Sequence, residues 1–171
     1  MPQQNNHPSP VRRLTRGALL TAIALTIFMV EAQIPSPIPI PGVKLGLANI
    51  ITVYAMYLLG PGDTLMILVS RIFLGAVFSG QMMTLLYSLG GGLCCFCAML
   101  VLRRIISPDH MWLTSAVAAL FHNMGQLLVA AGVMKTWAVL AYLPYLVLAG
   151  VCAGVFTGLC AQFLVRRLSK T

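Results

Sequence analysis

Long apolar stretches of membrane-spanning length constrain this chain more than any other feature. Between Asp63 and Met83 the only charged side chain is that of Arg71. About 20 apolar residues in a helix cross the ~30 Å hydrocarbon core of a bilayer. Overall, 59% of the residues are hydrophobic and 8% are charged, whereas soluble proteins average about 45–50% and 25%. The sequence therefore predicts an all-α integral membrane protein.

Prolines, glycines and charges divide the chain into about six expected spans. One compact six-helix transmembrane bundle is expected over residues 12–171, preceded by a disordered cytoplasmic tail, residues 1–11. The alternating prolines of residues 35–42 predict a stiff extended loop. The uncharged run 136–165 exceeds the length that a bilayer requires, so its part before Pro144 is expected at the interface. The expected spans are residues 14–34, 44–59, 63–80, 82–102, 111–134 and the run from Pro144 to 165.

The net charge of +8 is expected to report topology rather than nucleic-acid binding, because the cations gather at the ends of apolar stretches. Cytoplasmic termini leave only Lys44 and Lys135 outside, as the positive-inside rule favours. Residues 12–32 also fit a cleavable signal peptide, with Val30-Glu-Ala32 as its cleavage site. We favour an uncleaved anchor, because the charge of Glu31 is unusual there. The residues then expected inside are Arg12, Arg13, Arg16, Arg103, Arg104, Arg166, Arg167 and Lys170.

Arg71 is the strongest candidate for a functional residue, because isolated charge in hydrocarbon is costly. A helix entering from the turn 60–62 would place it roughly 13 Å deep. In one interpretation Arg71 faces an internal cavity and holds an anion or a carboxylate. In the other it snorkels, or pairs with a carbonyl or with Glu31, for structure alone.

Further polar residues are expected at membrane depth, several of them beneath the proline-rich loop. They predict a lidded pocket that opens to the outside. His122 and Gln126 would share a helix face through their four-residue spacing. The alternative is that such groups only bond across helices as packing contacts. The candidate ligand-binding residues are Arg71, Glu31, Lys44, Asn49, Gln81, Tyr87, His122, Asn123 and Gln126.

Small residues at four-residue spacing predict helix faces that allow close backbone approach. Packing inside the bundle is the default expectation for each such stripe. The run Gly90-Gly-Gly92 predicts a bend, a thin packing surface or an unwound stretch that lines a cavity. The stripes are Ala18-x-x-x-Ala22, Ala76-x-x-x-Gly80 and Gly150-x-x-x-Gly154-x-x-x-Gly158.

Catalysis and metal binding are poorly supported by the sequence. The five cysteines fall in uncharged stretches away from histidines, so they are expected to be buried apolar residues. The sequence has no Asp-Asp-x-x-Asp pair for magnesium and diphosphate, no nucleophile elbow, no phosphate-binding glycine loop and no zinc-spaced histidines. We therefore expect no enzymatic activity, no cofactor, no metal site and no nucleic-acid partner.

Two motifs carry a resemblance to a known family. The run Pro41-Gly-Val-Lys-Leu-Gly-Leu-Ala-Asn49 and the run Ser70-Arg-Ile-Phe-Leu-Gly75 resemble the small bacterial family called Gx transporter. That family is also labelled heptaprenyl diphosphate synthase component I, and the resemblance covers about residues 12–167. It implies similarity to the substrate-capture S components of energy-coupling factor vitamin transporters. Those subunits are six-helix bundles that bind substrate from outside and topple when docked on an ATPase-driven module.

The resemblance also implies a partner surface and two alternative functions. In those S components an Ala-x-x-x-Ala pattern on the first helix contacts the module's transmembrane scaffold, and Ala18 and Ala22 match it. The favoured function is a substrate-binding subunit of an uptake transporter in the bacterial cell membrane, for a vitamin-like or isoprenoid or quinone-related compound. The alternative is a membrane accessory subunit of a polyprenyl diphosphate synthase, since the acidic motifs of such an enzyme are missing.

Overall fold

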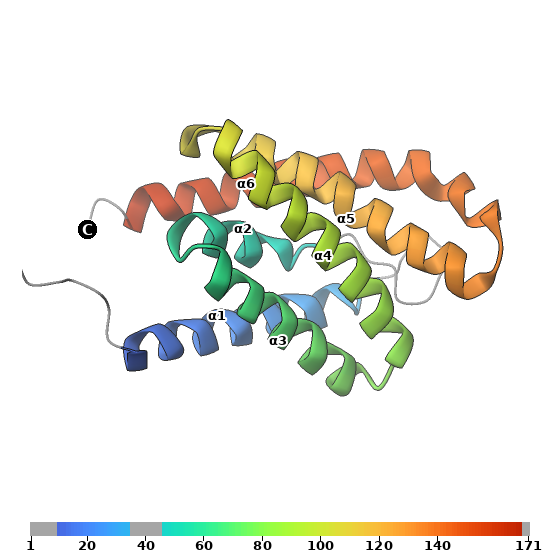
Figure 1. Ribbon diagram of the computed structural model, residues 1–171, viewed down its shortest axis with the longest axis horizontal. Coiled ribbons are helices and arrows are strands. Elements are labelled where there is room, and N and C mark those ends of the chain that lie inside the picture. The colour runs from blue at the N-terminus through green and yellow to red at the C-terminus, as the bar shows by residue number, and fades with distance from the viewer. Residues whose placement is uncertain (1–9, 35–45, 169–171) are drawn as a thin grey trace, which may run out of the picture.

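The computed structural model describes residues 10–34 and 46–168, and every structural statement below refers to these ranges. They form an all-α bundle (Figure 1). The consecutive arginines 103 and 104 and the proline-containing turns lie between helices or at their ends, much as the sequence predicts. The helices are α1 Pro10–Glu31, α2 Asn49–Leu58, α3 Pro61–Ser79, α4 Met82–Ile105, α5 Met111–Met134 and α6 Leu143–Leu168, with 3-10 turns η1 Pro108–His110 and η2 Trp137–Tyr142.

Five helical segments in the described ranges are long and apolar enough to cross a membrane, as a multi-pass membrane protein requires. The exception is α2, whose 10 residues reach about 15 Å, or half of a bilayer core. The sequence predicts a second span from Lys44 to Leu59, but the described helix begins only at Asn49. Gly46, just before it, has a φ of +84°, which a continuing helix cannot adopt. Lys44 itself lies outside the described residues.

Prolines mark helix starts, where the missing N–H removes no helical hydrogen bond. Pro61 begins α3, and Pro144 is the second residue of α6. The short turn η2 precedes α6, so the 30-residue uncharged run is divided near Pro144, as the sequence predicts. The three glycines 90–92 lie within an uninterrupted α4 and do not unwind it.

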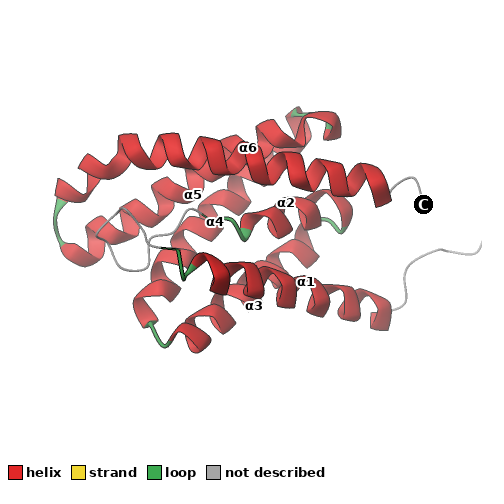
Figure 2. Ribbon diagram, turned by 180° about the vertical axis from the view of Figure 1, so that it is seen from behind, coloured by secondary structure: helices red, strands yellow, loops and turns green. Residues whose placement is uncertain are grey.

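Three side-chain contacts join helix termini at one end of the bundle. Nε of Arg13 donates a 2.6 Å hydrogen bond to Asp63, which joins the start of α1 to the start of α3. Arg103 at the end of α4 donates to the Met56 carbonyl of α2. Arg166 of α6 donates a hydrogen bond to Asp109 of the turn η1. The start of α1, the end of α4, η1 and the end of α6 lie at the same end of the bundle in both views (Figures 1 and 2). We call this end of the bundle the arginine end.

Helix α5 packs against both α4 and α6 over glycine faces. A Cβ at Gly158 would lie 2.5 Å from Cα of Trp112, and one at Gly90 would lie 3.2 Å from the Gly125 carbonyl. The stripe on α6 and the glycine run on α4 are therefore thin packing surfaces. This agrees with the expected packing role of the stripe and with one of the three roles considered for the run.

The other two small-residue stripes do not pack as expected. Ala18 and Ala22 are exposed, because the packed face of α1 is formed by Gly17, Thr21, Ala24 and Phe28. Gly80 has open space around it and ends α3 in a left-handed conformation. The four-residue spacing alone did not determine which way each face points. Packing inside the bundle is thus the wrong prediction for the stripe on α1 and for the end of the stripe on α3.

Candidate ligand-binding site

Arg71 points into the bundle from the middle of α3. Its residue surface is 3% exposed, and it belongs to the same helix face as Leu68, Ile72 and Gly75, which are also buried. No group in the described ranges accepts a hydrogen bond from its Nε or Nη2. The guanidinium is therefore held inside the protein rather than at an interface, with donors that the described residues leave unused.

Glu31 supplies a negative charge that acts on Arg71. It is the last residue of α1, and its carboxylate acts electrostatically on Arg71. Its Oε1 accepts a hydrogen bond of 2.6 Å from the N–H of Gly46, and Oε2 accepts one of 3.0 Å from the N–H of Leu47. Glu31 thus satisfies N–H groups that precede α2 and lack helical acceptors. Arg71 and Glu31 do not form an ion pair in the described structure.

Asn49 and His122 complete the arrangement from α2 and α5. A Cβ at Gly46 would lie 2.8 Å from Nδ2 of Asn49 and 3.1 Å from Cδ2 of His122, so all three residues are packed together. Both polar atoms of the Asn49 side chain and Nδ1 of His122 are buried without a partner in the described ranges. Arg71 also acts electrostatically on His122. We call Glu31, Asn49, Arg71 and His122 the buried polar cluster.

Glycine allows α4 to approach this cluster. A Cβ at Gly91 would lie 3.0 Å from Cε1 of His122 and 2.7 Å from Cγ of Gln126. Gln126 therefore lies beside the cluster, one helical turn beyond His122 on α5, as the four-residue spacing predicts. Five helices contribute to this region: the end of α1, the start of α2, and the middles of α3, α4 and α5.

The remaining candidates lie elsewhere. Asn123 faces α6, where its Nδ2 donates a 2.7 Å hydrogen bond to the Leu146 carbonyl. Tyr87 belongs to an apolar cluster with Leu127 and Leu146. Gln81 is exposed at the start of α4, and Lys44 lies outside the described residues. The structure thus gathers Arg71, Glu31, Asn49, His122 and Gln126, and it separates Gln81, Tyr87 and Asn123 from them.

The buried polar cluster is rich in donors. The guanidinium and the Asn49 amide both donate, and the imidazole Nδ1 can donate or accept. A buried polar group without a partner costs about 1–3 kcal/mol, and more when it is charged. A carboxylate or another oxyanion would satisfy several of these donors at once, because an Arg fork accommodates two oxygens. In this arrangement the residues can bind and orient an anionic group.

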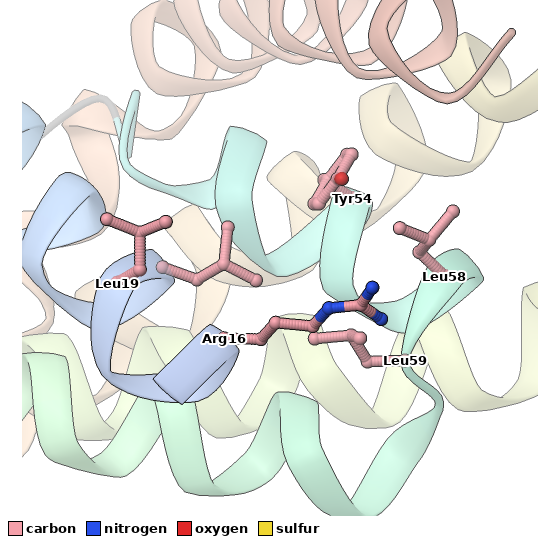
Figure 3. Close-up of a pocket in the computed structure, with 6 residues that line it drawn as sticks. Arg16, Leu19, Tyr54, Leu58 and Leu59 are labelled. Carbon is pink, nitrogen blue, oxygen red and sulfur yellow. The ribbon is translucent and has the colours of Figure 1, made fainter. Parts of the chain in front are cut away.

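A separate cavity of about 320 Å³ lies between α1 and α2 at the arginine end. Figure 3 shows the Arg16 side chain reaching from α1 toward the end of α2. The sequence predicts Arg16 only as a topological anchor and a pocket only near the proline-rich loop, so this cavity was missed. The one sequence signal for this cavity is that Leu19 and Leu20 follow Arg16 by three and four residues, which places all three on one face of a helix. The cavity is lined by Arg16, Leu19, Leu20, Tyr54, Leu58 and Leu59.

Comparison with known proteins identifies the family. A family model described as heptaprenyl diphosphate synthase component I matches residues 20–164, which is most of the chain. No curated protein and no solved structure shows a significant match. The match confirms the resemblance that the motifs around Lys44 and Arg71 suggest, although it does not test the likeness to S components. The chain therefore belongs to the heptaprenyl diphosphate synthase component I family.

Proposed function

We propose that the chain is a substrate-binding membrane subunit, similar to an S component, of an energy-coupling factor type uptake transporter. The observation that carries this proposal is the buried Arg71 guanidinium, whose Nε and Nη2 have no acceptor in the described ranges. The proposed ligand is a small vitamin-like, isoprenoid or quinone-related compound with a carboxylate or another anionic group. Asn49 and His122 provide further polar contacts for it.

The low dielectric around Arg71 supports this assignment. A charge-assisted hydrogen bond is stronger inside a protein than in water, and a charge without a partner is correspondingly costly there. Glu31 lowers that cost by acting on Arg71 through space, while its carboxylate bonds to the N–H groups of Gly46 and Leu47. Arg71 is therefore buried close to a negative charge yet retains donors for a ligand.

The proposed partner is an energy-coupling module composed of a transmembrane scaffold and ATPases. Ala18 and Ala22 would form the contact, and both are exposed on the face of α1 that the bundle leaves uncovered. Small side chains allow a partner helix to approach closely. The arginine end would face the cytoplasm of a bacterial cell, with both chain termini on that side. The chain would supply binding, and its partners would hydrolyse ATP.

Family membership favours a second candidate, a membrane accessory subunit of a polyprenyl diphosphate synthase. In that role a soluble partner chain would perform the chemistry. The three acidic residues of the chain support this division, because each makes a separate contact within the bundle. Asp63 bonds to Arg13, Asp109 bonds to Arg166, and Glu31 caps the segment before α2. Among the described residues no group of three or more His, Cys, Asp or Glu side chains is placed to hold a metal ion.

Native mass spectrometry of the gently purified full chain tests the transporter proposal. We expect wild-type protein to carry a small anionic compound. Arg71→Ala should lower its affinity roughly 10- to 100-fold, and Arg71→Lys should restore part of it. The matched control Arg104→Gln removes an exposed arginine outside the cluster and should leave occupancy unchanged. Unchanged occupancy in Arg71→Ala together with a lower melting temperature would show that Arg71 is purely structural.

The proteins that purify with the chain distinguish the two candidates. Co-purified ATPases and a membrane scaffold would support the transporter function, whereas a stable complex with a soluble prenyl synthase chain would support the accessory function. One affinity purification detects both kinds of partner. The ligand is measured in a separate experiment, so a result on the ligand does not depend on which partner is found.

A further inference from the structure

The unpartnered atoms of the buried polar cluster differ in kind, and this difference restricts which ligand can satisfy them. On Arg71 they are Nε and Nη2, and on Asn49 they are both Nδ2 and Oδ1 in the described ranges. The residue surfaces of Arg71 and Asn49 are 3% and 5% exposed, so bulk water does not satisfy these atoms. A ligand of the cluster must therefore match two hydrogen-bonding patterns, one at Arg71 and one at Asn49.

At Arg71 the pattern is a pair of donors. Nε and Nη2 lie on one edge of the planar guanidinium and their N–H bonds are parallel, which matches the two oxygens of a carboxylate. A phosphate monoester or a diphosphate also presents two oxygens, but it carries more negative charge. The charge of Glu31 already acts on Arg71, and like charges repel strongly where the dielectric is low. The cluster therefore favours a carboxylate, with its single charge, over a phosphate or diphosphate.

At Asn49 the pattern is a donor beside an acceptor. A ligand edge with an N–H group next to a carbonyl oxygen or a ring nitrogen satisfies Nδ2 and Oδ1 at once, as an adenine edge does for asparagine in DNA recognition. An isoprenoid tail offers neither group. A quinone carbonyl accepts from Nδ2 but donates nothing to Oδ1. The amide of Asn49 therefore favours a ligand that contains nitrogen over both of these classes.

A structural role does not account for the Asn49 side chain. Asparagine near a helix start often accepts hydrogen bonds from the first turn, but Oδ1 of Asn49 accepts none in the described ranges. The segment before α2 is held instead by Glu31, which bonds to the N–H groups of Gly46 and Leu47. Because Glu31 also acts on Arg71, the same contacts bring the start of α2 into the region of the guanidinium. One small molecule can then meet both patterns.

We infer that the ligand of the buried polar cluster is a monocarboxylate that also carries an N–H group beside a carbonyl or a ring nitrogen. Carboxylated cyclic amides, imides and ureas have this chemistry. The carboxylate binds along the Nε–Nη2 edge of Arg71, and the amide-like edge pairs with Asn49. This inference rests on the proposed transporter function and narrows its ligand to nitrogen-containing, vitamin-like acids, to the exclusion of isoprenoid and quinone-related compounds.

Binding of small probes to the full wild-type chain in phosphatidylcholine nanodiscs tests the inference. Orotate and hydantoin-acetic acid carry both features, benzoate and dimethylacrylate carry only the carboxylate, and uracil carries only the amide-like edge. We expect the tighter of the first two to bind at least about tenfold more tightly than each of the others, because an analogue without one group leaves buried polar atoms unpaired. Failure of both to bind, or equal binding of benzoate or of the prenyl-type acid dimethylacrylate, would overturn the inference.

The variant Asn49→Leu separates the amide contact from the carboxylate contact. It should weaken binding of the tighter two-feature probe about tenfold and leave benzoate binding unchanged, whereas Arg71→Ala should weaken both. Without ligand its melting temperature should not fall, because the variant removes a buried amide that has no partner. Gln33→Leu replaces an exposed amide outside the cluster and should change neither probe. Equal losses of both probes in Asn49→Leu would overturn the inference.

The inference and the transporter function fail in different ways. Binding of all the carboxylates with equal affinity, lost in Arg71→Ala, would keep a substrate-binding subunit and overturn the inference. Selective binding of the two-feature probes without a co-purifying ATPase module would uphold the inference and remove the transporter function.

Discussion

Glu31 accepts a 2.6 Å hydrogen bond from the backbone N–H of Gly46, which joins the end of α1 to the segment that begins α2. The second carboxylate oxygen accepts from Leu47. A carboxylate at the start of a helix also interacts favourably with the helix dipole. Glu31 therefore has a structural role that is independent of any ligand, and its charge at the same time stabilises Arg71. Variants of Glu31 and Arg71 must be interpreted together.

We predict that Glu31→Gln destabilises the fold. A glutamine has one acceptor oxygen, so it can serve only one of the two N–H groups, and it no longer offsets the charge of Arg71. Losing a charged hydrogen bond costs about 1.5–3 kcal/mol of unfolding free energy. The melting temperature of purified protein in detergent measures the effect. Gln33→Ala, at an exposed neighbouring position, is the control and should melt like the wild type.

The double variant Glu31→Gln with Arg71→Ala isolates their interaction. Because the two residues act on each other electrostatically, the loss in the double variant should be smaller than the sum of the two single losses. Additive losses would contradict this coupling and would show that each residue acts alone.

We predict opposite effects for two glycine-to-alanine substitutions. A Cβ at Gly91 would lie 2.8 Å from the His122 carbonyl, so Gly91→Ala must push α4 away from α5, at a cost of about 1–3 kcal/mol. Gly132, in α5, has open space around it, and Gly132→Ala should stabilise the helix by about 0.5–1 kcal/mol. Melting temperatures measure both. A neutral Gly91→Ala would contradict the close packing of the two helices.

We predict that replacing Ala18 and Ala22 together with tryptophan leaves the isolated fold intact. Both residues are exposed, whereas Ala24 on the packed face of the same helix is 1% exposed. The double variant should keep its melting temperature but lose co-purification with an energy-coupling module, because bulky residues prevent close helix approach. Ala24→Trp is the matched control and should destabilise the fold itself. Retained co-purification of the double variant would show that the module binds elsewhere.

We predict that the arginine end faces the cytoplasm. Cysteine labelling at the N-terminus, between Arg103 and Asp109, and at the C-terminus should report the cytoplasmic side, and labelling beside Lys135 should report the outside. The start of α1, the end of α4, the turn η1 and the end of α6 share one end of the bundle in Figure 1. An outside signal from any of the first three positions would refute the topology, and a mature chain that starts near Gln33 would support the signal-peptide alternative.

The sequence by itself determined the class of the protein and where most helices begin and end. Long uncharged apolar stretches can satisfy their backbone in a membrane only as helices, and prolines and arginines interrupt those stretches. This local chemistry placed the start of α3 at the turn before Asp63 and the division near Pro144. The family was also recognisable from two short motifs.

Only the tertiary structure decided which side chains meet. Four-residue spacing marks a helix face, but lipid and protein interior are similarly apolar, so hydropathy does not show which face points inward. Both kinds of face occur in the structure: the face of Ala18 points outward, whereas that of Gly154 packs on α5. The contact of Glu31 with Gly46 and the cavity beside Arg16 depend on how distant segments pack. Such contacts are set by the geometry of the whole bundle. They cannot be predicted from any single stretch of sequence.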